Sequence, residues 1–177
     1  MNAKILLPIT VAWLLAGCAS APEQDTYTHR GVGEGVDITL DNLLESKEDR
    51  SYLIWLNAVR MREGAWDSNY YLEVRYEGAS DAGFLNIAPG ETLLLTIDGQ
   101  PMRFAGPGSD KSRSKTANAN FVENAVYEVK PEVIKRIARA KEIKVQVVGQ
   151  ARSLYRDFKP INTEKFRKFV LLHMGGF

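Results

Sequence analysis

The stretch that decides the fold is ETLLLTIDGQPMRF, which runs from Glu91 to Phe104. Apolar residues alternate with others before the pair Asp98-Gly99, and the alternation resumes after it. Asp-Gly between two alternating runs is the strongest short-range signal for a β-hairpin, because both residues tolerate the positive φ angles of its tight turn. The stretch therefore predicts two antiparallel strands joined at Asp98-Gly99.

Strand patterns also dominate the chain on both sides of this hairpin. Residues 70–77, YYLEVRYE, alternate strictly, whereas residues 52–61, YLIWLNAVRM, are apolar on both faces. Further strands are expected at residues 125–130 and 142–149, where apolar or tyrosine residues recur at every second position. Together these segments predict a sheet in which most strands are antiparallel.

Two short helices are expected in the last third of the chain. Pro131 stands at a favourable first helical position. An apolar face follows it, made of Val133, Ile134, Ile137 and Ala138. The strands that flank this short helix are compatible with a parallel crossover or with an antiparallel return. The second helix is expected to have Asn162 as its cap, with Ile161 and Phe166 placed as a hydrophobic staple, and to dock at the C-terminus.

These elements place the chain in the α+β class. We expect a mostly antiparallel β-sheet or sandwich of about seven strands with two short helices, the last of them C-terminal. Seven phenylalanines, seven tyrosines and three tryptophans can supply its core. Residues 36–177 are predicted to form this single domain, and the polar residues 18–35 are predicted to form a tether in front of it.

Two surface features are candidate binding sites. Residues 106–120 lack large apolar side chains and are expected to form an exposed, mobile loop, in which Lys111, Arg113 and Lys115 make a small basic cluster. Either this cluster is simply solvated or it binds an anion. Trp66, Tyr70 and Tyr71 surround an expected turn, where their rings either form a platform for a sugar or peptide or pack into the core.

The composition argues against several kinds of chemistry. The chain has 23 basic and 22 acidic residues, which gives no general attraction for nucleic acid. Its single cysteine and two distant histidines make no motif for a metal or a nucleophile. Glu73 and Glu77 lie about 13 Å apart along an extended strand, too far for a glycosidase pair. We therefore expect no cofactor, no metal and no enzymatic activity.

The N-terminus has the profile of a targeting segment. After Lys4, residues 5–17 are uncharged and largely apolar. As a helix they would cover about 20 Å, which is short of the roughly 30 Å of a bilayer core. These residues are therefore expected to act as a signal peptide and not as a membrane span.

The run ends in Leu15-Ala16-Gly17-Cys18, which resembles the lipobox of bacterial lipoproteins at all four positions. The resemblance implies cleavage between Gly17 and Cys18 after residues 1–17, with lipid on the Cys18 sulfur that anchors the mature chain in a membrane. An ordinary signal peptide cut near Ala19-Ser20-Ala21 is the alternative. Ala19 stands where an aspartate would imply retention in the inner membrane, so the resemblance implies the outer membrane, with the domain facing the periplasm.

A second resemblance covers residues 93–149. The hairpin, the tyrosine strand, the IARAK helix and the strand that ends at Gly149 are similar to small, uncharacterised bacterial secreted proteins and lipoproteins. These shared segments determine the fold and contain no catalytic residue, so the resemblance implies the architecture alone.

Three functions remain open at this point. The first expectation is a lipid-anchored envelope domain that binds another envelope protein as an accessory subunit. The alternatives are a domain that binds a small molecule, glycan or lipid, and an enzyme such as a hydrolase.

The anchor is directly testable. We expect Cys18→Ser to remove the lipid attachment site, and each acyl methylene contributes about 0.8 kcal/mol to membrane binding. The variant should appear as an uncleaved precursor or a soluble periplasmic form when cells are fractionated. Normal fractionation of the variant with the membrane, at the mobility of the mature wild type, would contradict the lipoprotein interpretation.

Overall fold

The computed structural model describes residues 26–30, 34–39, 41–44, 46, 51–64 and 67–177. The expected signal peptide and the expected lipidation site, Cys18, lie outside these residues. The described elements, in chain order, are β1 (Thr26–Arg30), β2 (Glu34–Thr39), β3 (Leu43–Leu44), β4 (Tyr52–Glu63), β5 (Asp67–Gly78), β6 (Gly90–Ile97), β7 (Gln100–Gly106), the 3₁₀ helix η1 (Asp110–Ser112), β8 (Arg113–Lys115), β9 (Phe121–Val129), α1 (Pro131–Arg139), β10 (Ile143–Val148), β11 (Ser153–Asp157) and α2 (Pro160–His173).

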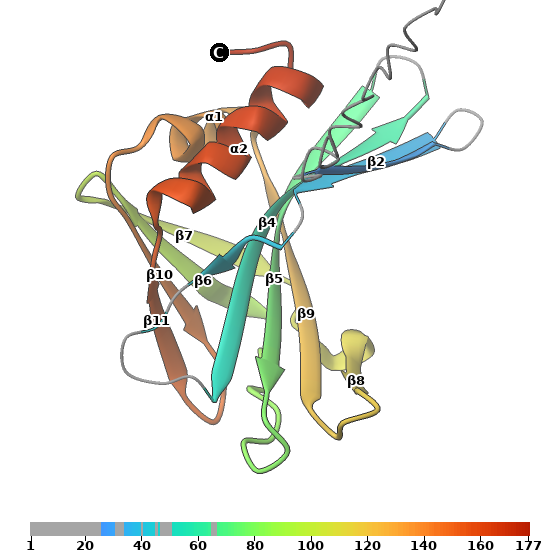
Figure 1. Cartoon of the computed structure of the whole chain (residues 1–177), viewed down its shortest axis with the longest axis vertical. Helices are drawn as coiled ribbons and strands as arrows, with labels where there is room; N and C mark the ends of the chain where they lie inside the picture. The colour runs from blue at the N-terminus through green and yellow to red at the C-terminus, as the bar shows by residue number, and fades with distance from the viewer. Residues whose placement is uncertain (1–25, 31–33, 40, 45, 47–50, 65–66) are drawn as a thin grey trace, which may run out of the picture.

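The strands form two sheets, and neighbouring strands pair antiparallel throughout. Sheet A has the order β1-β2-β4-β5-β9-β8, with β3 also paired to β4, and sheet B has the order β11-β10-β6-β7. Helices α1 and α2 pack together across one end of the strands (Figure 1). The predicted α+β class is confirmed. The described strands outnumber the seven expected because strands as short as β3 and β8 are too short to show a period.

The hairpin predicted at Asp98-Gly99 is confirmed as the β6–β7 turn. Its two residues have φ angles of +49° and +80°, as a tight turn between twisted strands requires. The apolar residues of β6 that point inward are fully buried: Leu93, Leu95 and Ile97. The turn also docks onto the segment after α1, because Asp98 Oδ1 accepts the backbone N–H groups of Lys141 and Glu142, both at 2.9 Å.

The predicted alternation of residues 70–77 is also confirmed. Leu72, Val74 and Tyr76 of β5 are fully buried and face sheet B, whereas the intervening residues point to the outer face of sheet A. The inner faces of both sheets and the buried sides of the helices form one hydrophobic core. Because all of these elements share the core, they stabilise one another as a single unit.

Helix α1 begins at Pro131 as predicted, and it buries Ile134, Ile137 and Ala138. It follows β9 of sheet A and leads to β10 of sheet B. The connection is therefore neither the parallel crossover nor the antiparallel return that the sequence left open, because the two flanking strands lie in different sheets.

Helix α2 begins two residues before the expected cap. Lys159 is the N-cap residue, and Asn162 is the third helical residue, whose Oδ1 accepts the Lys159 N–H at 2.8 Å. The Asn162 amide also donates to Asn42 Oδ1 at 2.9 Å and to the Leu43 carbonyl at 2.8 Å. The hydrophobic staple prediction was wrong, because Ile161 is 60% exposed.

The buried carboxylate of Glu123, on β9, fastens the two loops that pass between the sheets. Its oxygens accept the N–H groups of Asn86 at 2.8 Å and Ile87 at 3.1 Å in the β5–β6 loop. They also accept the Ser109 hydroxyl at 2.5 Å, from the segment that returns after β7. One carboxylate, itself fully buried, therefore holds both loops against sheet A.

Residues 106–120 are mostly exposed, as expected, but they are not a loop throughout. Ser109 is fully buried, and η1 and β8 lie within this range. The sequence conceals this order, because the buried contact is made by one small polar side chain and not by apolar residues. The expected tether also overlaps described structure, since β1 pairs with β2 within its range.

Replacing the buried carboxylate should destabilise the domain. In Glu123→Gln, an amide NH₂ group replaces one acceptor oxygen and faces backbone or hydroxyl donors. We expect a loss of about 3 kcal/mol in the free energy of unfolding, measured with denaturant. Glu128→Gln is the matched control on the exposed side of the same strand, and its effect should stay within about 0.5 kcal/mol. Equal effects of the two substitutions would contradict the role of Glu123.

The hairpin turn makes a prediction about pH. Backbone hydrogen bonds from Glu142 and then Lys141 hold the pKa of Asp98 below its ordinary value. A depressed folded pKa stabilises the fold above the unfolded pKa of about 3.9, and this contribution is lost as pH falls through the lower folded value. The stability difference between wild type and Asp98→Asn should therefore be constant near neutrality and shrink below about pH 4.

Denaturant unfolding at a series of pH values measures this difference. Asp81→Asn, at an exposed position of the β5–β6 loop, is the matched control for removing a surface carboxylate. A wild-type advantage over Asp98→Asn that grows on acidification would contradict the assignment.

Candidate functional site

The outer face of sheet B presents one continuous row of side chains across its four strands. Tyr155 of β11 lies opposite Gln146 of β10, which lies opposite Leu94 of β6, which lies opposite Arg103 of β7. Strands lie about 4.8 Å apart, so this row, called the Tyr155 row here, is roughly 14 Å wide. An aromatic ring therefore stands at one end and a guanidinium group at the other.

A second row runs parallel to the first, closer to the helices. It consists of Asp157, Lys144, Thr96 and Pro101, in strand order β11, β10, β6 and β7. Lys144 Nζ lies 3.2 Å from Glu142, and both side chains are exposed. The two rows together form a polar surface with an apolar centre at Leu94.

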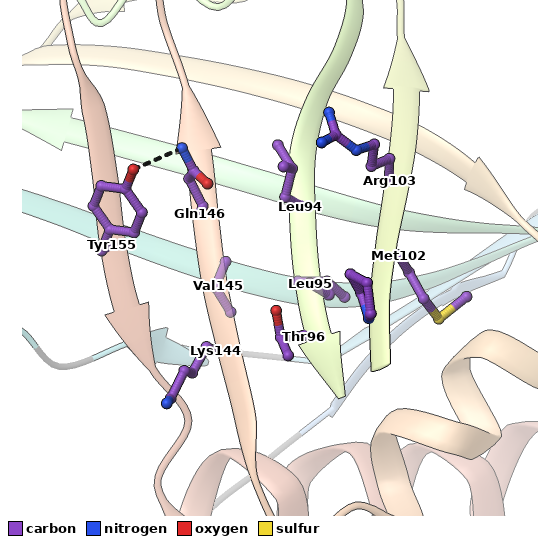
Figure 2. A pocket seen from close by; sticks show the side chains of 10 residues that line it. Leu94, Leu95, Thr96, Met102, Arg103, Lys144, Val145, Gln146 and Tyr155 are labelled. Carbon is purple, nitrogen blue, oxygen red and sulfur yellow. Dashed lines mark hydrogen bonds between the residues drawn. The ribbon is translucent and has the colours of Figure 1, made fainter. Parts of the chain in front are cut away.

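The two rows line a shallow hollow of about 240 Å³. Figure 2 shows Tyr155 and Gln146 on one side of it, Arg103 on the other, and Leu94 between them. Tyr155 is 65% exposed, yet its hydroxyl is held by a 2.9 Å hydrogen bond from the Gln146 amide. The hydrogen bond places the exposed ring beside Gln146, where a ligand on this face can contact it.

The structure separates the two tyrosines that the sequence analysis placed on a platform. Tyr70 packs against the core, whereas its neighbour Tyr71 points to the outer face of sheet A, because successive residues of a strand face opposite sides. Trp66 lies outside the described residues. The structure therefore does not bring Tyr70 and Tyr71 together on one surface.

Tyr71 instead lines a second hollow, wide and open, of about 400 Å³. Its walls come from β5, the end of β7 and β9, and include Gly106, Pro107, Val126 and Glu128. Val126 is 42% exposed. This surface carries one aromatic ring and one carboxylate, and it spans both sheets, because Tyr71, Val126 and Glu128 belong to sheet A whereas Ala105 and Gly106 belong to β7 of sheet B.

Two of the three cations of the predicted basic cluster are engaged by neighbouring side chains. Arg113 lies 2.7 Å from Asp110 and 3.6 Å from the buried Glu123, and it stacks over Phe84 at 5.8 Å. Lys115 lies over the ring of Phe121 at 4.5 Å. Lys111 is exposed on η1. Arg113 and Lys115 are thus engaged by contacts that hold the loop itself.

A separate group of charges lies where α2 meets sheet A. Asp37 is 1% exposed and receives Arg60 Nη2 at 2.6 Å, Arg62 Nε at 3.5 Å and His173 Nδ1 at 3.6 Å. Arg60 also donates to the carbonyl of His173. The His173 ring packs against Phe169 at 5.2 Å. His173 is largely buried on α2, and the group fastens α2 to β2 and β4.

The pKa of Asp98, in the hairpin turn, is lowered by the backbone hydrogen bonds from Glu142 and Lys141. The pKa of Tyr127 is raised by burial, against the opposing effect of its hydrogen bond with Thr92. Neither residue lines either of the two hollows described above. Both shifts follow from contacts that hold the fold together.

Within the part of the chain that the structure describes, no three His, Cys, Asp or Glu side chains are grouped to hold a metal ion. No helix in those residues is long and apolar enough to cross a membrane.

Sequence inspection missed the Tyr155 row because its members come from four strands between positions 94 and 155. The available signal was the alternation in residues 153–157, SLYRD, where Leu154 and Arg156 are buried and Tyr155 is exposed. Alternation alone identifies the outward residues of each strand, but the register that aligns them appears only in the folded sheet.

Comparisons of the chain with protein-family models, with curated proteins and with solved structures find no match in any of the three.

Proposed function

We propose that this chain is a lipid-anchored, non-enzymatic protein of the bacterial cell envelope that binds another envelope protein through the outer face of sheet B. The lipid is carried by Cys18 after removal of residues 1–17, and the domain faces the periplasm from the outer membrane. The lipobox at residues 15–18 supports the anchor. The Tyr155 row supports the binding function.

The observation that carries the proposal is the chemistry of this row. Tyrosine and arginine are enriched among the residues that dominate protein interfaces, because each combines a large contact area with hydrogen bonding. Here Gln146 and Arg103 flank Leu94, and Tyr155 lies beyond Gln146, so a partner segment laid along the row contacts Arg103 at one end and Tyr155 at the other. The Arg103 side chain is 63% exposed, and its ion pair with Glu91, at 3.9 Å, is long and solvated. An acidic group of a partner can therefore displace Glu91 at little cost.

The size of the hollow favours a protein partner over a small ligand. Pockets that enclose drug-sized molecules measure about 300 to 1,000 Å³ and bury most of the ligand. The hollow on sheet B, at about 240 Å³, is smaller and shallow. Its surface suits a protruding acidic segment with one apolar side chain, supplied by the surface of another protein.

Site-specific crosslinking in living cells tests this function. A photoreactive phenylalanine analogue replaces Tyr155 in the full-length chain, and the crosslinked species are purified under denaturing conditions and identified by mass spectrometry. The matched control carries the same group at Val126, an exposed outward position of sheet A. We expect one discrete envelope protein from position 155 that is not captured from position 126.

Charge reversal separates specific binding from proximity. Arg103→Glu should remove the crosslink from position 155 while the protein stays in the membrane fraction. Identical crosslinks from both positions, or persistence in Arg103→Glu, would contradict binding at the Tyr155 row. A discrete partner from position 126 alone would place the binding surface at the second hollow.

A further inference from the structure

The solvent face of helix α2 is unusually apolar. Phe166, Phe169 and Val170 point into the core. At about 100° per residue, Ile161, Leu171 and Leu172 lie on the opposite side, and they are 60%, 60% and 67% exposed. The outer face of a surface helix is ordinarily polar. This helix therefore exposes three apolar side chains among the charged residues of its outer face, in addition to the apolar face that packs within the domain.

Cations surround these exposed side chains. The two helices together carry six lysine or arginine residues and two glutamates, while the whole chain has 23 basic and 22 acidic residues. Positive charge is thus concentrated on the helical end of a nearly neutral protein. At the end of the chain, Phe177 is 50% exposed and lies 4.8 Å from the Arg139 guanidinium. Leucine and phenylalanine among lysines and arginines are typical of a helix that lies on an anionic bilayer.

The described fold also begins beside this helix. In β1, Thr28 lies opposite Asp37 of β2, and Asp37 contacts His173 at the end of α2. Helix α2 itself contacts β1. Seven residues lie between Cys18 and Thr26, and the eight steps along the chain span at most about 28 Å when fully extended. A lipid on Cys18 therefore holds the bilayer close to the C-terminal end of α2.

We propose that the outer face of α2, with the adjacent cations of α1, docks on the surface of an anionic phospholipid bilayer. Leu171, Leu172 and Phe177 enter the boundary between headgroups and acyl chains, and Lys168, Arg136 and Arg139 contact the phosphates. This inference rests on the lipid anchor of the proposed function, which supplies the high local concentration of membrane that a short amphipathic face needs.

Lipid-borne quenching of a fluorophore on the native protein tests the proposal. With Cys18 acylated, an introduced cysteine is the only free thiol in the chain. Leu172→Cys places the label on the outer face of α2, and Asp81→Cys places it on the exposed β5–β6 loop as the matched control. The purified lipidated proteins are reconstituted on phosphatidylglycerol or phosphatidylcholine vesicles that contain a brominated lipid.

We expect strong quenching at position 172 on phosphatidylglycerol vesicles, little on phosphatidylcholine, and none at position 81 on either. Lys168→Glu combined with Arg136→Glu should lower the docked population by about tenfold, because two attractive charges become repulsive. Lys111→Glu combined with Lys115→Glu is the control with equal change in net charge, and it should leave quenching intact.

The failures of the anchor and of the docking are distinguishable. If the protein sediments with the vesicles but positions 172 and 81 are quenched equally, the anchor stands and the docking proposal falls. If the protein stays in the supernatant with both vesicle types, both proposals fall. A dimer in detergent that Leu171→Ser and Leu172→Ser dissociate would also overturn the docking, because a second copy would then cover this face.

Discussion

The fold depends on one buried carboxylate, that of Glu123, which holds the two segments of the chain that cross between the sheets. The β5–β6 loop runs from sheet A to sheet B, and the segment after β7 runs back to sheet A. Glu123 accepts hydrogen bonds from both segments. The two passages also touch each other, since Ser109 donates its N–H to the Ile87 carbonyl at 2.9 Å. Gly108 has a φ of +82°, and a Cβ there would lie 2.8 Å from that carbonyl oxygen. Only glycine fits the crossing without displacement. Sheet B, and every surface that it presents, is positioned through this contact.

Local patterns predicted several of the longer elements, because each of these follows from the chemistry of a few adjacent residues. The Asp98-Gly99 turn, the alternation of β5 and the start of α1 at Pro131 all have this character. The start of α2 was misplaced because Asn162 is used differently from an ordinary cap. Its amide spans α2 and the segment around Asn42, and a contact between positions 120 residues apart leaves no local pattern.

The difference between local patterns and long-range contacts also explains which features of the candidate sites could not be predicted from the sequence. Arg113 and Lys115 were grouped by sequence proximity, but folding assigns each to a different aromatic ring and gives Arg113 two carboxylates as well. Tyr155, by contrast, had no aromatic neighbour in the sequence to draw attention to it. Its surroundings are built from Gln146 and from strands β6 and β7, and they exist only because four strands pair in one register. Strand pairing thus decides which side chains lie together on the surface of a sheet, and a single sequence does not show that pairing.

The two proposed surfaces are compatible because they belong to different parts of the domain. The Tyr155 row lies on the outer face of sheet B, while α1 and α2 lie together across one end of the strands (Figure 1). With the helices on the bilayer, the strands of sheet B extend away from it, and the row of Thr96 and Lys144 lies between the helices and the Tyr155 row (Figure 2). A partner protein then binds at the side of the domain, next to the membrane, and not between the domain and the lipid. Docking would fix the orientation of the binding face, and a fixed orientation lowers the rotational entropy lost when a membrane-bound partner binds.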